Sequence, residues 1–273
     1  MGEHTRNPRL LPDSSFGRTI GTSSPPGQTK FNAWITCPFP KPTAQVRLFC
    51  LPFAGGAASI YRTWGPALPQ MVEVCPIQLP GRENRLSEPL YTNVGVLAER
   101  LAHEILAYAE KPFALFGHSM GALLAFELTR ALRRHDGPLP RALFLSAHRA
   151  AHLPLRRQPL SGLPDGEFIR AVRRLGGTPD GVFEHPELRK LALPVLRADF
   201  TMCDRYSFVP ESPLNCPLIL YAGRQDIEVL PQEVEVWREH TTGVARLHLF
   251  PGDHFFLRSD RDVLLRSIAS VLA

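Results

Sequence analysis

The stretch LFGHSMGALLAF, residues 115–126, is an apolar run in which Gly117 and Gly121 flank Ser119. The segment FALFG just before the serine is typical of a buried β-strand, and MGALLAFELTRAL after it has the apolar spacing of a helix. A strand, a tight turn and a helix around G-x-S-x-G form a nucleophile elbow, which holds its serine in a strained backbone conformation. Side chains at the two glycine positions would collide with the strand or the helix. The alternative is a glycine-rich turn that serves packing alone.

Short apolar runs alternate with helical patterns from residue 46 to the end of the chain. The helical patterns cover 93–110, the residues after Ser119, about 231–240 and 260–272. This alternation predicts an α/β fold with a mostly parallel, doubly wound sheet, whose ligands bind beyond the carboxyl ends of the strands. The predicted strands are 46–51, 72–79, 113–117, 141–147, 217–223 and 245–250.

Two segments depart from this alternation. Residues 1–44 are rich in Pro, Gly, Ser and Thr and have few periodic apolar positions, which predicts a disordered extension before a single domain at 45–273. Residues 150–212 contain two helical patterns and no convincing strand. An insertion at the carboxyl edge of a sheet is typical of a lid over a site.

Composition excludes several classes of protein. No window approaches the roughly 18 apolar residues of a membrane span, and the N-terminus lacks the apolar core of a signal peptide, so we expect a cytoplasmic protein with no membrane partner. The net charge of +5 comes largely from residues 1–44, and no basic stripe is interleaved with aromatics, which argues against nucleic-acid binding. The five cysteines show no metal-ligand spacing, and we expect reduced thiols, no metal and no cofactor.

A serine nucleophile needs a base, and the base needs an acid that holds its tautomer. In hydrolases of this architecture the chain order is Ser, then Asp or Glu, then His. Asp226 follows the strand at 217–223 and His254 follows the strand at 245–250, so both fall at the same sheet edge as Ser119.

Other residues near these positions fit other roles better. Asp253 adjoins His254, so its carboxylate does not easily reach the same ring and suits a turn. We interpret His118 as a packing or hydrogen-bonding residue and His148 as a pocket or surface residue. The N–H of Met120, which follows the nucleophile, and the N–H of Ala54, with Phe53 as the alternative, are predicted to bind the oxyanion.

Motifs spread along residues 46–273 strengthen this interpretation: LFCLPFAGGAASIYRTW, IQLPGRENRLSEP, LFGHSMGALLAFEL, LPVLRADFTMCDRY, LILYAGRQDIEVLPQEVEVW and FPGDHFFL. Together they resemble the type II thioesterases associated with polyketide and nonribosomal peptide synthases, which have an α/β-hydrolase fold with a helical lid. In that family Ser119 matches the nucleophile, Asp226 the acid and His254 the base, while Ala54 and Met120 match the oxyanion-hole positions.

The resemblance implies an enzyme that hydrolyses acyl groups from the phosphopantetheine thiol of a carrier protein, to remove stalled or aberrant units. Separately, we expect the protein to be a monomer. Two other functions are compatible with the same residues: a carboxylester hydrolase, and a non-catalytic protein that binds acyl carriers. Lid arginines either meet an acidic carrier or form a solvated face; they are Arg156, Arg157, Arg170, Arg173 and Arg174. Phe53, Phe255 and the lid residues Phe200, Met202 and Tyr206 are candidates for the acyl-binding pocket, with a plain lid core as the alternative for the last three.

Overall fold

A computed structural model describes residues 31–273. Its centre is a parallel six-stranded sheet in the order β2-β1-β3-β4-β5-β6. All five strand pairs are parallel, so every strand presents its carboxyl end at the same edge. The strands are β1 (Val46–Leu51), β2 (Val72–Pro76), β3 (Phe113–His118), β4 (Leu143–Ser146), β5 (Leu218–Gly223) and β6 (Ala245–Phe250). The predicted strands are therefore confirmed, with small shifts at their ends.

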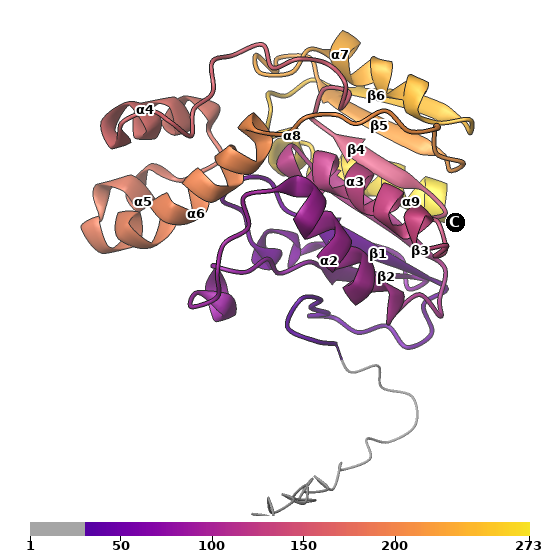
Figure 1. Ribbon diagram of the computed structural model, residues 1–273. Coiled ribbons are helices and arrows are strands. Elements are labelled where there is room, and N and C mark those ends of the chain that lie inside the picture. The colour runs from indigo at the N-terminus through magenta and orange to yellow at the C-terminus, as the bar shows by residue number, and fades with distance from the viewer. Residues whose placement is uncertain (1–30) are drawn as a thin grey trace, which may run out of the picture. The chain divides into compact units, whose positions relative to one another are not determined.

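Helices cover both faces of the sheet, and the side chains of β1 show why. Phe49 and Leu51 pack into the core beneath α2 (Val94–Leu106) and α3 (Met120–Arg134), whereas Leu48 and Cys50 pack toward the opposite face. That face is covered by α1 (Trp64–Ala67), α8 (Phe256–Ser259) and α9 (Arg261–Leu272), as Figure 1 shows. Because successive side chains of a strand point to opposite faces, a continuous apolar run fills two cores at once.

The inserted segment between β4 and β5 forms three helices: α4 (Asp165–Leu175), α5 (Asp180–Glu184) and α6 (Pro186–Asp204). They have a small apolar core of their own, which includes Phe168, Phe183 and Phe200. In Figure 1 they lie beside the carboxyl edge of the sheet, away from the chain's C-terminus. The two predicted lid helices correspond to α4 and α6, and the sequence analysis missed α5. The last α-helix before β6 is α7 (Pro231–Glu235), which runs into a 3-10 turn, η3 (Val236–His240).

The predicted disordered extension ends too late in the sequence. Residues 1–30 lie outside the described part of the chain, but 31–44 pack against the domain. Trp34 is 7% exposed and lies against the guanidinium of Arg85, whose Cζ is 3.9 Å from the ring centroid. Ile35 is fully buried and forms an isolated antiparallel bridge with Ile77. These isolated contacts fix the segment to the domain, and it forms neither a helix nor a long strand. For that reason its sequence shows no periodic apolar spacing.

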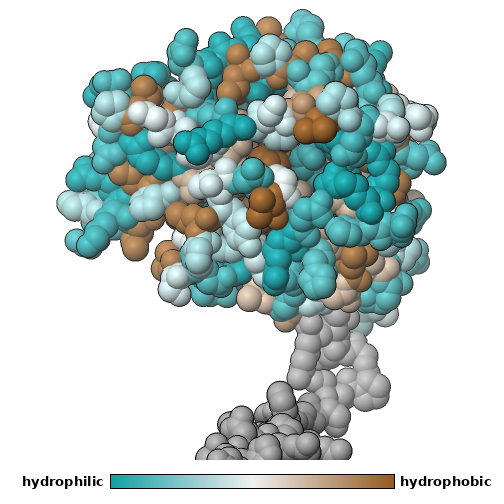
Figure 2. Space-filling model, viewed as in Figure 1, coloured by the Kyte–Doolittle hydropathy of each residue, from teal (hydrophilic) through white to brown (hydrophobic). Residues whose placement is uncertain are grey.

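The face of the molecule that Figure 2 presents is predominantly polar. Figure 2 shows apolar side chains interspersed among hydrophilic ones on the face that Figure 1 presents. Within residues 31–273, no helix combines the length and hydropathy that crossing a bilayer requires.

The packing of Trp34 generates a stability prediction. Trp34→Ala removes a buried ring and its stacking on Arg85, and we expect the free energy of unfolding to fall by roughly 3–5 kcal/mol in urea denaturation. Phe39 belongs to the same segment but is 42% exposed, and Phe39→Ala serves as the control. Equal losses in the two variants would show that the segment contributes no specific burial.

Candidate active site

Ser119 lies in the turn between β3 and α3, and its backbone is strained. Its φ is 54° and its ψ is −121°, a backbone conformation that residues other than glycine rarely adopt. The Ser119 N–H donates to the carbonyl of Ser146 on the neighbouring strand β4, at 2.8 Å. The surrounding sheet therefore holds the serine at the carboxyl edge, in the turn that the sequence predicted.

The two flanking glycines are required by close backbone approach. A Cβ at position 117 would lie 2.0 Å from the carbonyl oxygen of Gly121, and a Cβ at position 121 would lie 2.2 Å from the carbonyl oxygen of Leu51. The first contact closes the turn around Ser119. The second brings the start of α3 against the end of β1, and with it the loop that carries Ala54.

Three side chains from separate loops form a hydrogen-bonded chain at this edge. His254 Nε2 is 3.0 Å from Ser119 Oγ, and His254 Nδ1 is 2.7 Å from Asp226 Oδ2. The other carboxylate oxygen of Asp226 accepts the N–H groups of Glu228 at 2.8 Å and Val229 at 3.0 Å. The carboxylate is thus buried, with a side chain that is 1% exposed, and three hydrogen bonds hold its orientation. This arrangement can draw a proton from the serine and stabilise the resulting imidazolium.

Two backbone amides face the same region. The N–H of Met120 is the first of α3, where no intrahelical acceptor is available, and the N–H of Ala54 lies in the loop after β1. Within the described part of the chain, neither amide donates to a protein acceptor. Both are therefore free to bind an oxyanion, and Ala54 and Met120 both line the cavity over Ser119.

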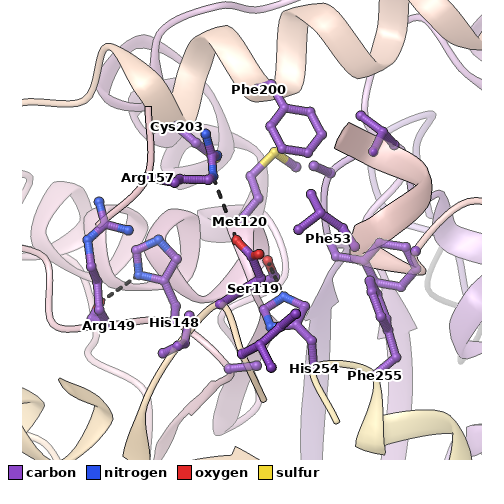
Figure 3. Close-up of a pocket in the computed structure, with 18 of the residues that line it drawn as sticks. Phe53, Ser119, Met120, His148, Arg149, Arg157, Phe200, Cys203, His254 and Phe255 are labelled. Carbon is purple, nitrogen blue, oxygen red and sulfur yellow. Dashed lines mark hydrogen bonds and ion pairs between the residues drawn. The ribbon is translucent and has the colours of Figure 1, made fainter. Parts of the chain in front are cut away.

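A cavity of about 240 Å³ opens over Ser119. Figure 3 shows Phe200 and Cys203 of the lid on one side of Ser119 and His254 on the other, with Phe53 and Phe255 along one wall. Of the five residues predicted for the pocket, Phe53, Phe200 and Phe255 line this cavity.

Met202 and Tyr206 do not line it. Met202 is buried in the main core, because it lies on the face of α6 opposite to Phe200 and Cys203. Tyr206 follows α6, and its hydroxyl donates to Glu127 Oε1 at 2.6 Å. The lid-core alternative is also wrong for these two side chains, because both pack against the main core and neither belongs to the small core of the lid.

Burial keeps three further titratable groups at the site neutral: His118, His148 and Cys203. Burial lowers the pKa of His118 well below its usual value, and Nδ1 of its ring is 2.9 Å from Ser146 Oγ. Burial, with the nearby charge of Arg149, lowers the pKa of His148 to about 3. Burial also raises the pKa of the Cys203 thiol to about 12, so this cysteine is no rival nucleophile. His118 has the packing role that the sequence suggested, and His148 lines the cavity.

The sequence analysis missed polar residues that reach the site from distant segments. Arg157 and Glu228 line the cavity with 3.8 Å between Nε and Oε2, and Arg157 also pairs with Asp204 of α6. Asp199 of α6 accepts the N–H of Gly55, beside Ala54. Asp199 and Glu228 stand in motifs quoted above, but their partners lie far away in the chain and the motifs do not indicate them.

One further cluster lies outside the site. The ligand atoms of Cys37, Glu73 and Cys75 fall within 4.8 Å of one another. However, the Glu73 carboxylate accepts Arg47 Nε at 3.0 Å and the Lys41 N–H at 2.9 Å, and burial raises the pKa of Cys75 well above its usual value. A cationic partner and a protonated thiol both disfavour metal binding.

Comparison with known proteins places this geometry in a family. The model of the thioesterase domain matches residues 46–272. The chain belongs to the thioesterase domain family. The family match covers the whole sheet, the lid and all the site residues described above.

Relatives and solved structures of this family resemble the chain over most of its length. The linear gramicidin dehydrogenase LgrE of Brevibacillus parabrevis is 45% identical over 88% of this chain and 92% of its own. The RedJ thioesterase of the prodiginine pathway in Streptomyces coelicolor is 41% identical, with a TM-score of 0.78 over 84% of this chain and 86% of that one. The type II thioesterase BorB of the borrelidin cluster is 38% identical, with a TM-score of 0.82 over 90% and 100%. The fold is accordingly that of a thioesterase with an α/β-hydrolase core, as the sequence resemblance implied.

The buried neutral histidine at the cavity wall generates a pH prediction. Below about pH 6.5 the unfolded chain protonates residue 148, whereas the folded thioesterase does so only near pH 3. This histidine therefore adds stability above pH 6.5 that is lost on acidification, at roughly 1.4 kcal/mol per pH unit. We expect His148→Gln to flatten the dependence of unfolding free energy on pH by that slope between pH 6 and 4. Parallel curves for the two proteins would contradict the assignment of a neutral ring.

Proposed function

We propose that this thioesterase hydrolyses acyl thioesters through a covalent intermediate on Ser119. Ser119 Oγ attacks the thioester carbonyl carbon and passes its proton to His254 Nε2, while Asp226 stabilises the imidazolium. The tetrahedral intermediate collapses with loss of the thiolate, which receives the proton from His254 Nε2 and leaves as the thiol. Water then attacks the acyl-enzyme by the same route, releasing the acid and restoring Ser119.

The observation that carries this proposal is the pair of hydrogen bonds through His254, at 3.0 Å to Ser119 and 2.7 Å to Asp226. Both fall within the range for general-base catalysis. In each tetrahedral intermediate the negative oxygen would accept hydrogen bonds from the N–H groups of Ala54 and Met120. Within the described residues, neither N–H group donates to a protein acceptor. A thioester suits the site, because its carbonyl is activated and its thiolate leaves with little help from an acid.

We further propose that the acyl group arrives on the phosphopantetheine arm of a carrier protein in polyketide or nonribosomal peptide biosynthesis. ClbQ of the colibactin pathway and the type II thioesterase YbtT of the yersiniabactin pathway, each 31% identical to this chain, are described as proteins of NRPS/PKS pathways, which supports the same class of substrate here. A cavity of about 240 Å³ has room for a short acyl chain beside the reacting thioester. Removal of stalled acyl units is the task that fits this substrate.

Two exposed arginines of the lid offer a contact for such a carrier, which is acidic. Arg170 and Arg174 are exposed one turn apart on α4 and line a second cavity, which shares Arg157 and Glu228 with the cavity over Ser119. Within the described residues, neither Arg170 nor Arg174 has an ion-pair partner, whereas Arg173 pairs with Asp180.

A cytoplasmic location and a monomeric state stay predictions from the sequence.

The catalytic roles are tested by substitution of the serine and the acid. We expect Ser119→Ala to lower kcat by roughly 10⁴-fold or more, and Asp226→Asn to lower it about 10⁴-fold because it holds the wrong tautomer of His254. The measurement is release of free acid from a panel of carrier proteins loaded with different acyl groups. Ser270→Ala, at a serine on α9 remote from the cavity, is the matched control and keeps the wild-type rate.

The same panel separates the alternatives. A carboxylester hydrolase would cleave simple esters and leave the carrier-bound thioesters intact. A non-catalytic carrier-binding protein would show no difference between wild type and Ser119→Ala.

Carrier docking on α4 is tested by charge reversal. We expect Arg170→Glu combined with Arg174→Glu to raise KM for an acyl carrier by roughly 10-fold or more through repulsion, with KM for an acyl-N-acetylcysteamine unchanged. Arg62→Glu with Arg266→Glu makes the same change in charge at exposed positions outside both cavities. An equal rise of KM in the two double variants would show that the effect comes from net charge and not from docking on α4.

A further inference from the structure

The loop that carries Ala54 is held by the lid. The N–H of Gly55 donates to Oδ2 of Asp199 at 2.7 Å. Asp199 lies on lid helix α6 and is completely buried. The oxyanion-binding loop after β1 therefore has a direct, desolvated hydrogen bond to a charged group of the inserted segment.

A second charged residue completes the arrangement. Arg82, in the loop after β2, donates to both carboxylate oxygens of Asp199, at 2.8 Å and 2.9 Å. The same guanidinium nitrogen that contacts Oδ2 also donates to the carbonyl of Gly56 at 3.0 Å. Asp199 and Arg82 thus hold an N–H and a C=O of two consecutive loop residues. A bidentate pair of this kind has a defined orientation as well as charge.

The loop has little remaining freedom. The N–H of Gly56 donates to the carbonyl of Phe53 at 2.8 Å, and this carbonyl belongs to the same peptide group as the Ala54 N–H. Gly55 has a φ of 77°, and a Cβ there would lie 2.5 Å from a methyl carbon of Leu196 on α6. The turn thus sets the Phe53–Ala54 peptide plane, and α6 holds the turn from outside through Leu196 and Asp199.

We propose that Asp199 and Arg82 are positioning residues for the oxyanion hole, which is complete only while α6 occupies its place on the loop. This inference rests on the proposed function, in which Ala54 donates to the oxyanion on a Ser119 adduct. Neither side chain lines the cavity over Ser119, so both act through the loop rather than on the substrate. The lid then contributes to the chemical step as well as to the acyl-binding cavity, since transition-state stabilisation depends on preorganised donors.

The other possible role for the pair is to tie the lid to the body with no effect on chemistry. The chain offers a matched control for this role. Glu73 is 3% exposed, and its carboxylate also accepts one backbone N–H, from Lys41, and one arginine, Arg47. This second pair lies in the body at β2 and contributes nothing to the cavity lining. Glu73→Gln therefore reproduces the loss of a buried carboxylate without touching the loop.

The experiment compares wild type, Asp199→Asn, Arg82→Lys, Glu73→Gln and Ser119→Ala. In Asp199→Asn an amide NH₂ replaces one oxygen. In place of Oδ2 it opposes the Gly55 N–H and Arg82 Nη1, and in place of Oδ1 it opposes Arg82 Nη2. Either orientation breaks the bidentate pair and weakens the anchor of the loop. Three quantities are measured: kcat and KM for an acyl-N-acetylcysteamine, the melting temperature, and the inhibition constant of an alkyl boronic acid. The boronic acid forms a tetrahedral adduct with a serine and reports on the oxyanion hole.

We expect Asp199→Asn to lower kcat and to raise the inhibition constant of the boronic acid by a similar factor, roughly 10-fold to 100-fold. KM should change less than about threefold. Arg82→Lys keeps the charge but loses the bidentate contact, and should change both quantities in the same direction by less. Glu73→Gln should lower the melting temperature and leave kcat and inhibition at wild-type values.

Several results would overturn this proposal. Asp199→Asn or Arg82→Lys with wild-type kcat and inhibition would do so, and so would a loss of kcat that Glu73→Gln matches. Failure of both lid-pair variants to fold, with Glu73→Gln folded, would assign the pair to stability alone. The proposed function fails separately: full activity of Ser119→Ala would refute the nucleophile, whereas an inactive Ser119→Ala beside a fully active Asp199→Asn would refute only the positioning role.

Discussion

The site depends on how closely the backbone closes around the turn between β3 and α3. Ser119 has a φ of 54°, and this conformation exists only because no Cβ separates Gly117 from Gly121 or Gly121 from Leu51. The first approach exposes the serine at the carboxyl edge of the sheet. The second brings the loop after β1 to the start of α3, so that a single constraint places the proposed nucleophile Ser119 beside two N–H groups that have no acceptor within residues 31–273. The strain of one residue is offset by the packing of a parallel sheet that is buried on both faces.

Two buried aspartates, Asp226 and Asp199, are stabilised in the same way in different parts of the site. Asp226 accepts the N–H groups of Glu228 and Val229 and directs its remaining oxygen at His254. Asp199 accepts the N–H of Gly55 and directs its charge at Arg82. In both, a carboxylate removed from water is stabilised by backbone donors and one cationic or polarisable partner, as burial of charge requires. One carboxylate orients the base, and we infer that the other orients the loop that binds the oxyanion.

Local sequence patterns predicted much of this architecture because its strands and helices alternate regularly. The apolar runs located all six strands, and parallel topology then implied that Ser119, Asp226 and His254 share one edge. The lid residues were harder to assign. Phe200 and Cys203 are three positions apart on α6 and both line the cavity, while Met202 points to the core. The helical spacing predicts that Phe200 and Cys203 share one face of α6 and that Met202 lies on another. It does not indicate which of these faces packs against the sheet domain.

Long-range contacts left no such signal. Arg82 and Asp199 are 117 residues apart, and neither stands in a motif whose spacing indicates a partner. The segment at 31–44 falls in the predicted extension because residues 1–44 together have few periodic apolar positions and many Pro, Gly, Ser and Thr. The burial of Trp34 and Ile35 depends on contacts with Arg85 and Ile77, which only the folded chain brings near.

The most direct test of the central claim is to trap the covalent intermediate. The protein is mixed with an acyl-N-acetylcysteamine, quenched in acid within milliseconds, digested and analysed by mass spectrometry. The account predicts an acyl group on the peptide that contains Ser119, formed with wild type and absent from His254→Ala on the same timescale. Hydrolysis at the full wild-type rate with no acyl group on Ser119, or with the acyl group on another residue, would contradict it.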